Sequence, residues 1–137
     1  MTLRNQIVEK HLYMVDILIR KYLGKGVECA VKQNEDMKLT AVFTRRDPTT
    51  LKIQTEGVRV LHVDDAPSMK EKIDVMVLCG GSATDLPEQT PAIASMFNCI
   101  DSFDTHAKIP AHFASVDAAA KKSGTLAMIS VGWDPGL

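Results

Sequence analysis

The alternation of strand-like and helix-like segments after residue 37 is the feature that most restricts the fold of this 137-residue chain. Short, apolar and partly β-branched runs favour strands. Three of these runs are almost continuously apolar, which is typical of strands covered on both faces in a parallel sheet. The predicted strands are Lys38 to Thr44, Val58 to Val63, Asp74 to Cys79, Asn98 to Phe103 and Thr125 to Ser130.

Helices are expected between these strands. Asp85 is placed to cap a helix whose first turn holds Pro87 and Glu88, and a shorter helical turn is expected around Pro67 to Lys72. Pro110 is placed to open a helix with an apolar stripe that ends at Gly124. The resulting β-α-β-α-β order predicts an α/β fold with a doubly wound, mostly parallel sheet of five or six strands. The apolar positions of the two helices are Ile93, Met96 and Phe97, and Phe113, Val116 and Ala120.

Residues 1–22 allow two interpretations. An amphipathic helix is favoured, because apolar side chains recur at spacings of three and four and because a carboxylate such as Asp16 is costly inside a central strand. The alternative is a first strand at Met14 to Ile19. Gly24 and Gly26 are expected to interrupt the chain before a helical pattern resumes at Val27 to Gln33. The helical stripe consists of Val8, Leu12, Val15, Ile19 and Tyr22.

Composition excludes several classes of function. A formal net charge of −1 provides no general attraction to nucleic acid or to anionic membranes. The longest apolar runs are too short to span a bilayer. Cys29, Cys79 and Cys99 form no CxxC pair and no Cys/His metal spacing. A cytoplasmic protein without a metal site is therefore expected.

Thr44 ends the first of the strands after residue 37, about twenty positions after Gly24, and Arg45 and Arg46 follow it. In dinucleotide-binding folds the residue at this interval meets the adenosine ribose. Two arginines here suit a 2′-phosphate, which the planar guanidinium group binds well. A solvated basic turn is the alternative.

Two further strand ends carry polar groups. Cys79-Gly80-Gly81-Ser82 would let the main chain approach a ligand, or it is an ordinary Gly-Gly turn. Asp104 and Asp134 both follow predicted strands, so they either converge on one cationic amine or serve as cap and turn residues. His62, His106 and His112 show no ligand spacing, and surface or capping roles are expected for them.

The motifs "FTRRDP", "CGGSATDLPEQ", "DSFDTHAKIP" and "ISVGWDPG" together resemble the NADP-dependent meso-diaminopimelate dehydrogenases of bacterial lysine metabolism, from Leu23 to Leu137. The resemblance implies a Rossmann-like domain at residues 23–137 after an atypical segment at residues 1–22. It also implies oxidative deamination of the D-configured amino centre of meso-2,6-diaminopimelate, with hydride transfer to NADP⁺. The product is L-2-amino-6-oxopimelate.

Residue roles follow from the same resemblance. Asp104 and Asp134 match carboxylates that hold the reacting amino group, and Trp133 matches an aromatic wall beside it. The family is homodimeric, through a second domain that follows the "WDPG" motif. The positions matching cofactor contacts are Leu23, Gly24, Thr44, Arg45, Arg46, Cys79, Gly80, Gly81, Ser82, Ser102, Phe103, Val131, Gly132, Trp133, Asp134 and Pro135.

The chain departs from the family at the phosphate turn. The family reads Gly-x-Gly-x-x-Gly, whereas the six positions ending at Gly24 keep only the last glycine. A second alignment matches Met1 to Arg4 with the family's first residues and treats the segment up to Tyr22 as an insertion. Little turnover is expected of this chain alone. Two alternatives to a dehydrogenase are a noncatalytic remnant with weak or no nucleotide binding, and an interaction module that packs Leu3 to Tyr22 on another chain.

Overall fold

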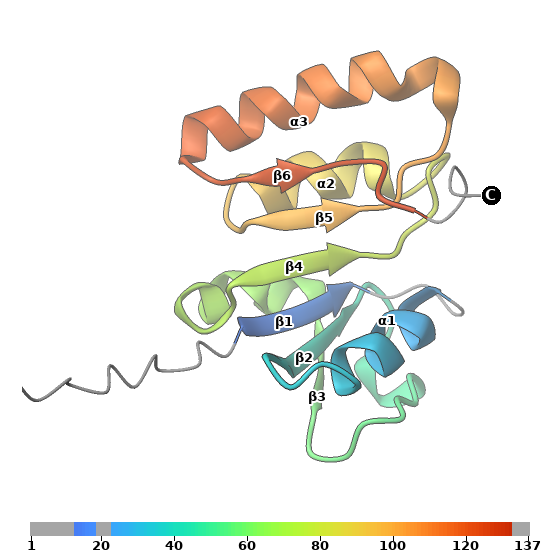
Figure 1. Cartoon of the computed structure of the whole chain (residues 1–137), viewed down its shortest axis with the longest axis vertical. Coiled ribbons are helices and arrows are strands. Elements are labelled where there is room, and N and C mark those ends of the chain that lie inside the picture. The colour runs from blue at the N-terminus through green and yellow to red at the C-terminus, as the bar shows by residue number, and fades with distance from the viewer. Residues whose placement is uncertain (1–12, 19–22, 133–137) are drawn as a thin grey trace, which may run out of the picture.

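Six parallel strands form one sheet in the computed structural model, which describes residues 13–18 and 23–132. The strand order is β3-β2-β1-β4-β5-β6, so the chain builds outward from β1 in one direction and then returns to build outward in the other (Figure 1). This is the doubly wound order of dinucleotide-binding folds, and it confirms the predicted fold class. The strands are β1 (Tyr13–Leu18), β2 (Met37–Thr44), β3 (Arg59–His62), β4 (Val75–Leu78), β5 (Cys99–Asp101) and β6 (Ala127–Met128).

The first strand corrects the helix expected before residue 23. Tyr13–Leu18 is β1, which pairs in parallel with both β2 and β4 at the centre of the sheet. The strand interpretation was therefore right for this segment. The helical spacing of its apolar residues carried less weight than two ladders of backbone hydrogen bonds. The remaining residues before Leu23 lie outside the described residues.

Three α-helices and three 3₁₀ helices connect the described strands. Helix α3 begins one residue before Pro110 and ends at Gly124, as predicted. Helix α1 starts at Leu23 and includes both Gly24 and Gly26, so the expected interruption at these glycines was wrong. The helices are α1 (Leu23–Lys32), η1 (Pro48–Thr50), η2 (Val63–Lys72), α2 (Leu86–Ala94), η3 (His106–Lys108) and α3 (Ile109–Ser123).

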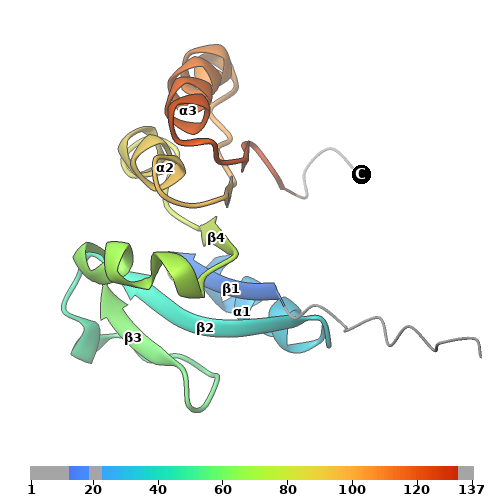
Figure 2. The same ribbon diagram turned by 90° about the vertical axis from the view of Figure 1, so that its left-hand side faces the viewer.

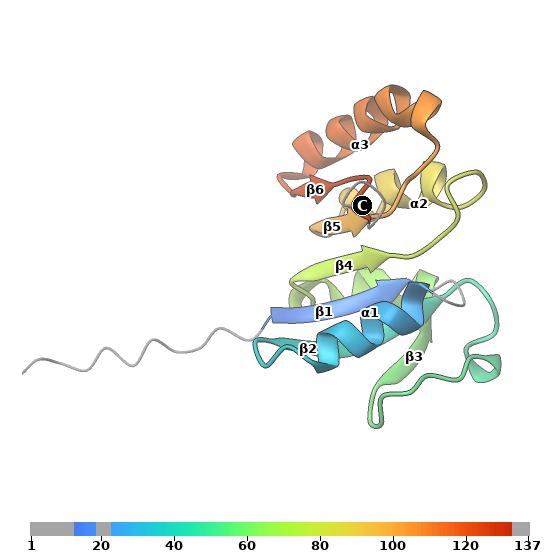
Figure 3. The same cartoon turned by 45° about the vertical axis from the view of Figure 1, so that its right-hand side comes forward.

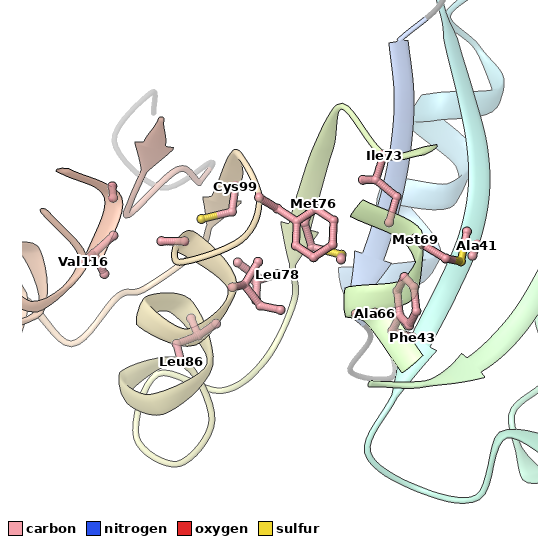
Figure 4. Packing of buried hydrophobic residues seen from close by; sticks show 14 of the residues in the cluster. Ala41, Phe43, Ala66, Met69, Ile73, Met76, Leu78, Leu86, Cys99 and Val116 are labelled. Carbon is pink, nitrogen blue, oxygen red and sulfur yellow. The ribbon is translucent and has the colours of Figure 1, made fainter. Parts of the chain in front are cut away.

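Apolar clusters lie on both faces of the sheet. On one face, η2, α2 and α3 pack against β2, β4 and β5, with Leu78 of β4 near Leu86 of α2 and Phe43 of β2 beside Met69 of η2 (Figure 4). Helices α2 and α3 lie side by side (Figure 2). Helix α1 lies on the other face (Figure 3). There, Val31 of α1 joins a smaller cluster with Leu39 and with residues of the loop after η1. Strands β2 and β4 are covered on both faces, which explains their nearly continuous apolar runs.

Strand β2 contains a bulge that decides which of its side chains meet each face. Val15 of β1 pairs with Leu39 of β2, and Ile17 of β1 pairs with Val42 of β2. Between these two pairs β2 has one residue more than β1. The extra residue reverses the alternation of side chains. Leu39 and Val42 therefore share the α1 face, whereas Ala41 and Phe43 pack on the opposite face.

Candidate functional site

A cleft of about 1490 Å³ lies at the carboxyl edge of the sheet. All pairings in the sheet are parallel, so the strand ends meet along this edge, beside the β1/β4 point where the strand order reverses. Ten predicted site residues line the cleft: Leu23, Thr44, Arg45, Arg46, Cys79, Gly80, Gly81, Ser82, Ser102 and Asp104. Four segments that are distant in the sequence therefore form one site.

The basic wall of the cleft follows β2. Thr44 is buried at the strand end, and its Oγ1 accepts a hydrogen bond from the Arg46 backbone N–H at 3.1 Å, which shapes the turn. The side chain of Arg45 pairs with the carboxylate of Asp85 across the cleft. Among the described residues, no acidic side chain pairs with Arg46, which is exposed. The wall thus presents one anchored and one unanchored guanidinium group.

The Gly-Gly turn after β4 forms the second wall. The backbone N–H of Gly81 donates to Oδ2 of Asp85 at 3.0 Å. A Cβ atom at position 80 would lie 2.7 Å from Cβ of Asp85 and 2.9 Å from Oε1 of Gln89. Only glycine fits between these side chains. Burial raises the pKa of the Cys79 thiol to about 12, so this cysteine stays protonated.

Ser82 and Asp104 join the exits of β4 and β5. The Ser82 hydroxyl donates to Oδ1 of Asp104 at 2.5 Å and accepts from the Asp104 backbone N–H at 2.8 Å. This reciprocal contact fixes the carboxylate of Asp104 while leaving the residue exposed at the cleft. An exposed, oriented carboxylate is suited to binding a cationic amine.

A buried polar cluster under the β5 exit was not predicted. Oδ2 of Asp101 accepts from Thr90 Oγ1 and pairs with His112 Nε2, both at 2.7 Å. Oδ1 accepts from the backbone N–H groups of Phe103, at 3.1 Å, and Ser130, at 2.8 Å. The carboxylate thereby ties the segment after β6 to β5. No periodic sequence signal marks such a contact between segments far apart in the chain.

Three of the four histidines lie among the described residues, and they differ in their roles. His62 accepts from the Asp64 backbone N–H at 3.2 Å and caps η2, and His106 is exposed at the start of η3, as predicted. The surface role expected for His112 was wrong, because this residue is only 5% exposed. Its ring stacks on Phe103 with a centroid distance of 4.0 Å.

Several predicted cofactor contacts lie outside the cleft lining. Gly24 is buried within α1, and Phe103 is 2% exposed in the core. Val131 and Gly132 are exposed beyond β6, where the Val131 N–H donates to the Asp101 carbonyl at 2.9 Å. Trp133, Asp134 and Pro135 lie outside the described residues. The predicted convergence of Asp104 and Asp134 is therefore not tested.

The cleft also has a lining that sequence reasoning missed. Asp85 was interpreted as a helix cap, yet its side chain makes no capping hydrogen bond to α2. Glu28 of α1 is buried, and its Oε1 accepts from the backbone N–H and hydroxyl of Thr55. Nearness to the Gly-Gly turn was the available signal for Asp85. The missed residues are Lys25, Glu28, Thr50, Leu51, Lys52, Thr84, Asp85 and Gln89.

The described part of the chain lacks a metal site and a membrane-spanning helix. Residues 13–18 and 23–132 contain no group of three metal-ligating side chains. No helix within these ranges is long and apolar enough to cross a membrane. The three cysteines are free thiols.

The chain was compared with known proteins. No family model matches it. The meso-diaminopimelate D-dehydrogenase of Ureibacillus thermosphaericus is 67% identical over 115 residues, which are 84% of this chain and 35% of that protein. The chain thus spans about a third of the length of the curated relatives that it matches.

Solved structures agree with the sequence comparison. A Clostridium tetani meso-diaminopimelate dehydrogenase mutant with diaminopimelate matches at a TM-score of 0.79 and 50% identity, over 90% of this chain and 38% of that one. An engineered D-amino acid dehydrogenase bound to NADP⁺ matches at a TM-score of 0.82 and 37% identity, over 91% of this chain and 38% of that one.

Proposed function

From the homology of its 115 matched residues to the meso-diaminopimelate D-dehydrogenases, we propose that this chain forms the NADP-binding part of such an enzyme. The observation that carries the proposal is the pair Arg45 and Arg46 in the wall of the cleft, beside the point where the strand order reverses. The high identity favours this function over a noncatalytic remnant.

The cleft fits a dinucleotide in size and in chemistry. Its volume of about 1490 Å³ exceeds that of most drug-sized ligand pockets. Thr44, Arg45 and Arg46 would hold the 2′-phosphate, because guanidinium groups and a hydroxyl donate to its oxygens. Gly80, Gly81 and Ser82 would let the backbone approach the cofactor closely. The amino end of α1, which opens at Leu23, adds a positive dipole end at the same edge.

In the proposed reaction, bound NADP⁺ would supply the hydride acceptor for the carbon that carries the D-configured amino group of meso-diaminopimelate. The role of this chain is then to orient that carbon. Asp104, held by Ser82, would bind the amino group as an ammonium ion, together with Asp134 and beside Trp133. The bound ammonium group would first lose one proton to solvent, so that the nitrogen lone pair forms the imine as the hydride leaves the carbon, and this step needs no covalent nucleophile. The buried free thiols suit a reducing cytoplasm.

Calorimetric titration of the chain with NADP⁺ and NAD⁺ tests the cofactor. We expect NADP⁺ to bind about tenfold or more tightly than NAD⁺, because the 2′-phosphate adds charge-assisted hydrogen bonds. Arg46→Ala should reduce this preference, whereas Lys121→Ala, on α3, should leave it unchanged. Equal affinity for both nucleotides, or binding of neither, would contradict the proposal.

The substrate is tested by nuclear magnetic resonance of the chain in the presence of NADP⁺. Adding meso-diaminopimelate should shift the backbone amide signals of Ser82 and Asp104, because the ammonium group would contact the Asp104 carboxylate. The LL isomer lacks the D-configured amino centre and should shift them less. Equal shifts with both isomers would count against the assigned stereochemistry.

A further inference from the structure

Asp85 stands at the N-cap position of α2 but uses its carboxylate elsewhere. An aspartate at this position ordinarily accepts a hydrogen bond from its own helix, yet the Asp85 side chain makes none. Its Oδ2 accepts from the Gly81 N–H, and its Oδ1 pairs with the Arg45 side chain. Residues that depart from the usual local preference, as Asp85 departs from helix capping, are expected at functional sites.

The ion pair joins the two walls of the cleft. Arg45 follows β2 and Asp85 follows the Gly-Gly turn after β4, and both line the cleft. The Asp85 side chain is 12% exposed, whereas that of Arg45 is 53% exposed. The buried carboxylate is therefore the fixed partner, and the guanidinium group extends from it toward solvent.

The contact leaves most of the Arg45 guanidinium group available. One terminal nitrogen, Nη2, pairs with Asp85, whereas the group carries five N–H donors in a planar fork. An arginine that is already held loses less side-chain freedom when a ligand binds. Arg46 pairs with no acidic side chain among the described residues, so it provides an internal comparison.

The approach of Asp85 depends on Gly80. A Cβ atom at position 80 would lie 2.7 Å from Cβ of Asp85, closer than such atoms pack. The absence of a side chain at Gly80 therefore lets Asp85 pack against this turn, in addition to letting the main chain approach a ligand. Asp85, Gly80 and Gly81 form one unit that supports Arg45.

We propose that Asp85 is a positioning residue, which holds Arg45 ready for the 2′-phosphate of the nucleotide. This inference rests on the proposed NADP-binding function. The negative charge of Asp85 also repels a phosphate, but the carboxylate is largely buried and receives two donors, which reduces the repulsion. Positioning therefore outweighs repulsion.

A double-mutant cycle tests the pair. Asp85→Ala should weaken NADP⁺ binding about tenfold and NAD⁺ binding much less. Asp85→Asn keeps an acceptor and should restore part of the loss. In the Arg45→Ala background, Asp85→Ala should change NADP⁺ affinity less than about twofold. Asp117→Ala removes a partly exposed carboxylate on α3 that pairs with Lys121, far from the cleft lining, and serves as the control.

Unchanged or tighter NADP⁺ binding by Asp85→Ala, or the same loss in the Arg45→Ala background, would overturn the inference. If the unaltered chain binds neither nucleotide, the proposed function fails, and a ligand-free measurement then decides the positioning role. Side-chain ¹⁵N relaxation should show the Arg45 Nε group more ordered than that of Arg46, and equally mobile after Asp85→Ala. Equal mobility of both arginines in the unaltered chain would refute the positioning role directly.

Discussion

At the residue scale, Thr90 and Thr40 show that a buried hydroxyl group contributes to the stability of the fold according to whether it has a hydrogen-bond partner. Thr90 Oγ1 donates to the buried carboxylate of Asp101, whereas Thr40 Oγ1 is buried with no hydrogen-bond partner among the described residues. Both side chains have nearly the shape of valine. The same substitution should therefore have opposite effects at the two positions.

Thr90→Val should lower the free energy of unfolding by about 2 kcal/mol, because Asp101 loses a donor to its charged group. Thr40→Val should raise it by about 1 kcal/mol, because an unpaired buried oxygen is removed. Urea denaturation measures both values. A loss of stability in both variants would show that the two hydroxyl groups do not differ in this way.

The buried cysteines predict a dependence of stability on pH. Burial raises the pKa of Cys79 and Cys99 from 9.0 to about 12, with the charge of Asp101 as a second cause at Cys99. The unfolded chain then loses protons that the folded chain keeps, so stability falls as pH rises from 9 toward 12. Urea denaturation across this range should show a shallower decline for Cys79→Ala than for the unaltered chain. Exposed Cys29→Ala is the control, and an identical slope for all three proteins would contradict the expectation.

At the element scale, two glycines on helices make opposite contributions. Gly124 ends α3 with φ of 70°, a left-handed conformation that disfavours side chains. Gly26 lies inside α1, where an added Cβ meets nothing within 4 Å. The former position requires glycine, whereas the latter tolerates alanine.

Gly124→Ala should lower the free energy of unfolding by about 1 kcal/mol because of the strain at positive φ. Gly26→Ala should raise it by roughly 0.5–1 kcal/mol, because alanine has the higher helix propensity. Thermal denaturation followed by circular dichroism compares the two variants. Destabilisation by Gly26→Ala would contradict the expectation that this helical position tolerates a side chain.

At the scale of the whole molecule, nucleotide binding should appear as stabilisation of the fold. At a concentration one hundred times its dissociation constant, NADP⁺ should stabilise the chain by about 2.7 kcal/mol. At equal concentrations the thermal shift with NADP⁺ should exceed that with NAD⁺. Added salt should reduce this difference, because Arg45 and Arg46 are exposed and salt screens their attraction to the 2′-phosphate. The Debye screening length falls from about 10 Å at 0.1 M salt to about 3 Å at 1 M. A salt-independent difference would exclude the two arginines as its source.

Much of the fold follows from local signals. The order of strands and helices after residue 37 was predicted correctly, and the relationship inferred from four short motifs is confirmed by 67% identity to a meso-diaminopimelate D-dehydrogenase. The segment Tyr13–Leu18 was interpreted wrongly because its apolar residues also fit helical spacing. Phe113 belongs to the apolar positions predicted for this helix but is 58% exposed on α3, whereas the neighbouring His112 is buried. The family's homodimer stays a prediction.

The sequence by itself determined the doubly wound fold class, the basic turn after β2, the Gly-Gly turn after β4 and the resemblance to known dehydrogenases. Each of these is encoded by residues that are neighbours along the chain. Only the tertiary structure decided that Asp85 holds Arg45 and Gly81, that Ser82 holds Asp104, and that Asp101 joins Thr90, His112 and Ser130. These contacts link residues from different strand exits and helices. Parallel strands bring such residues to one edge of the sheet, and no local pattern encodes which of them then pair.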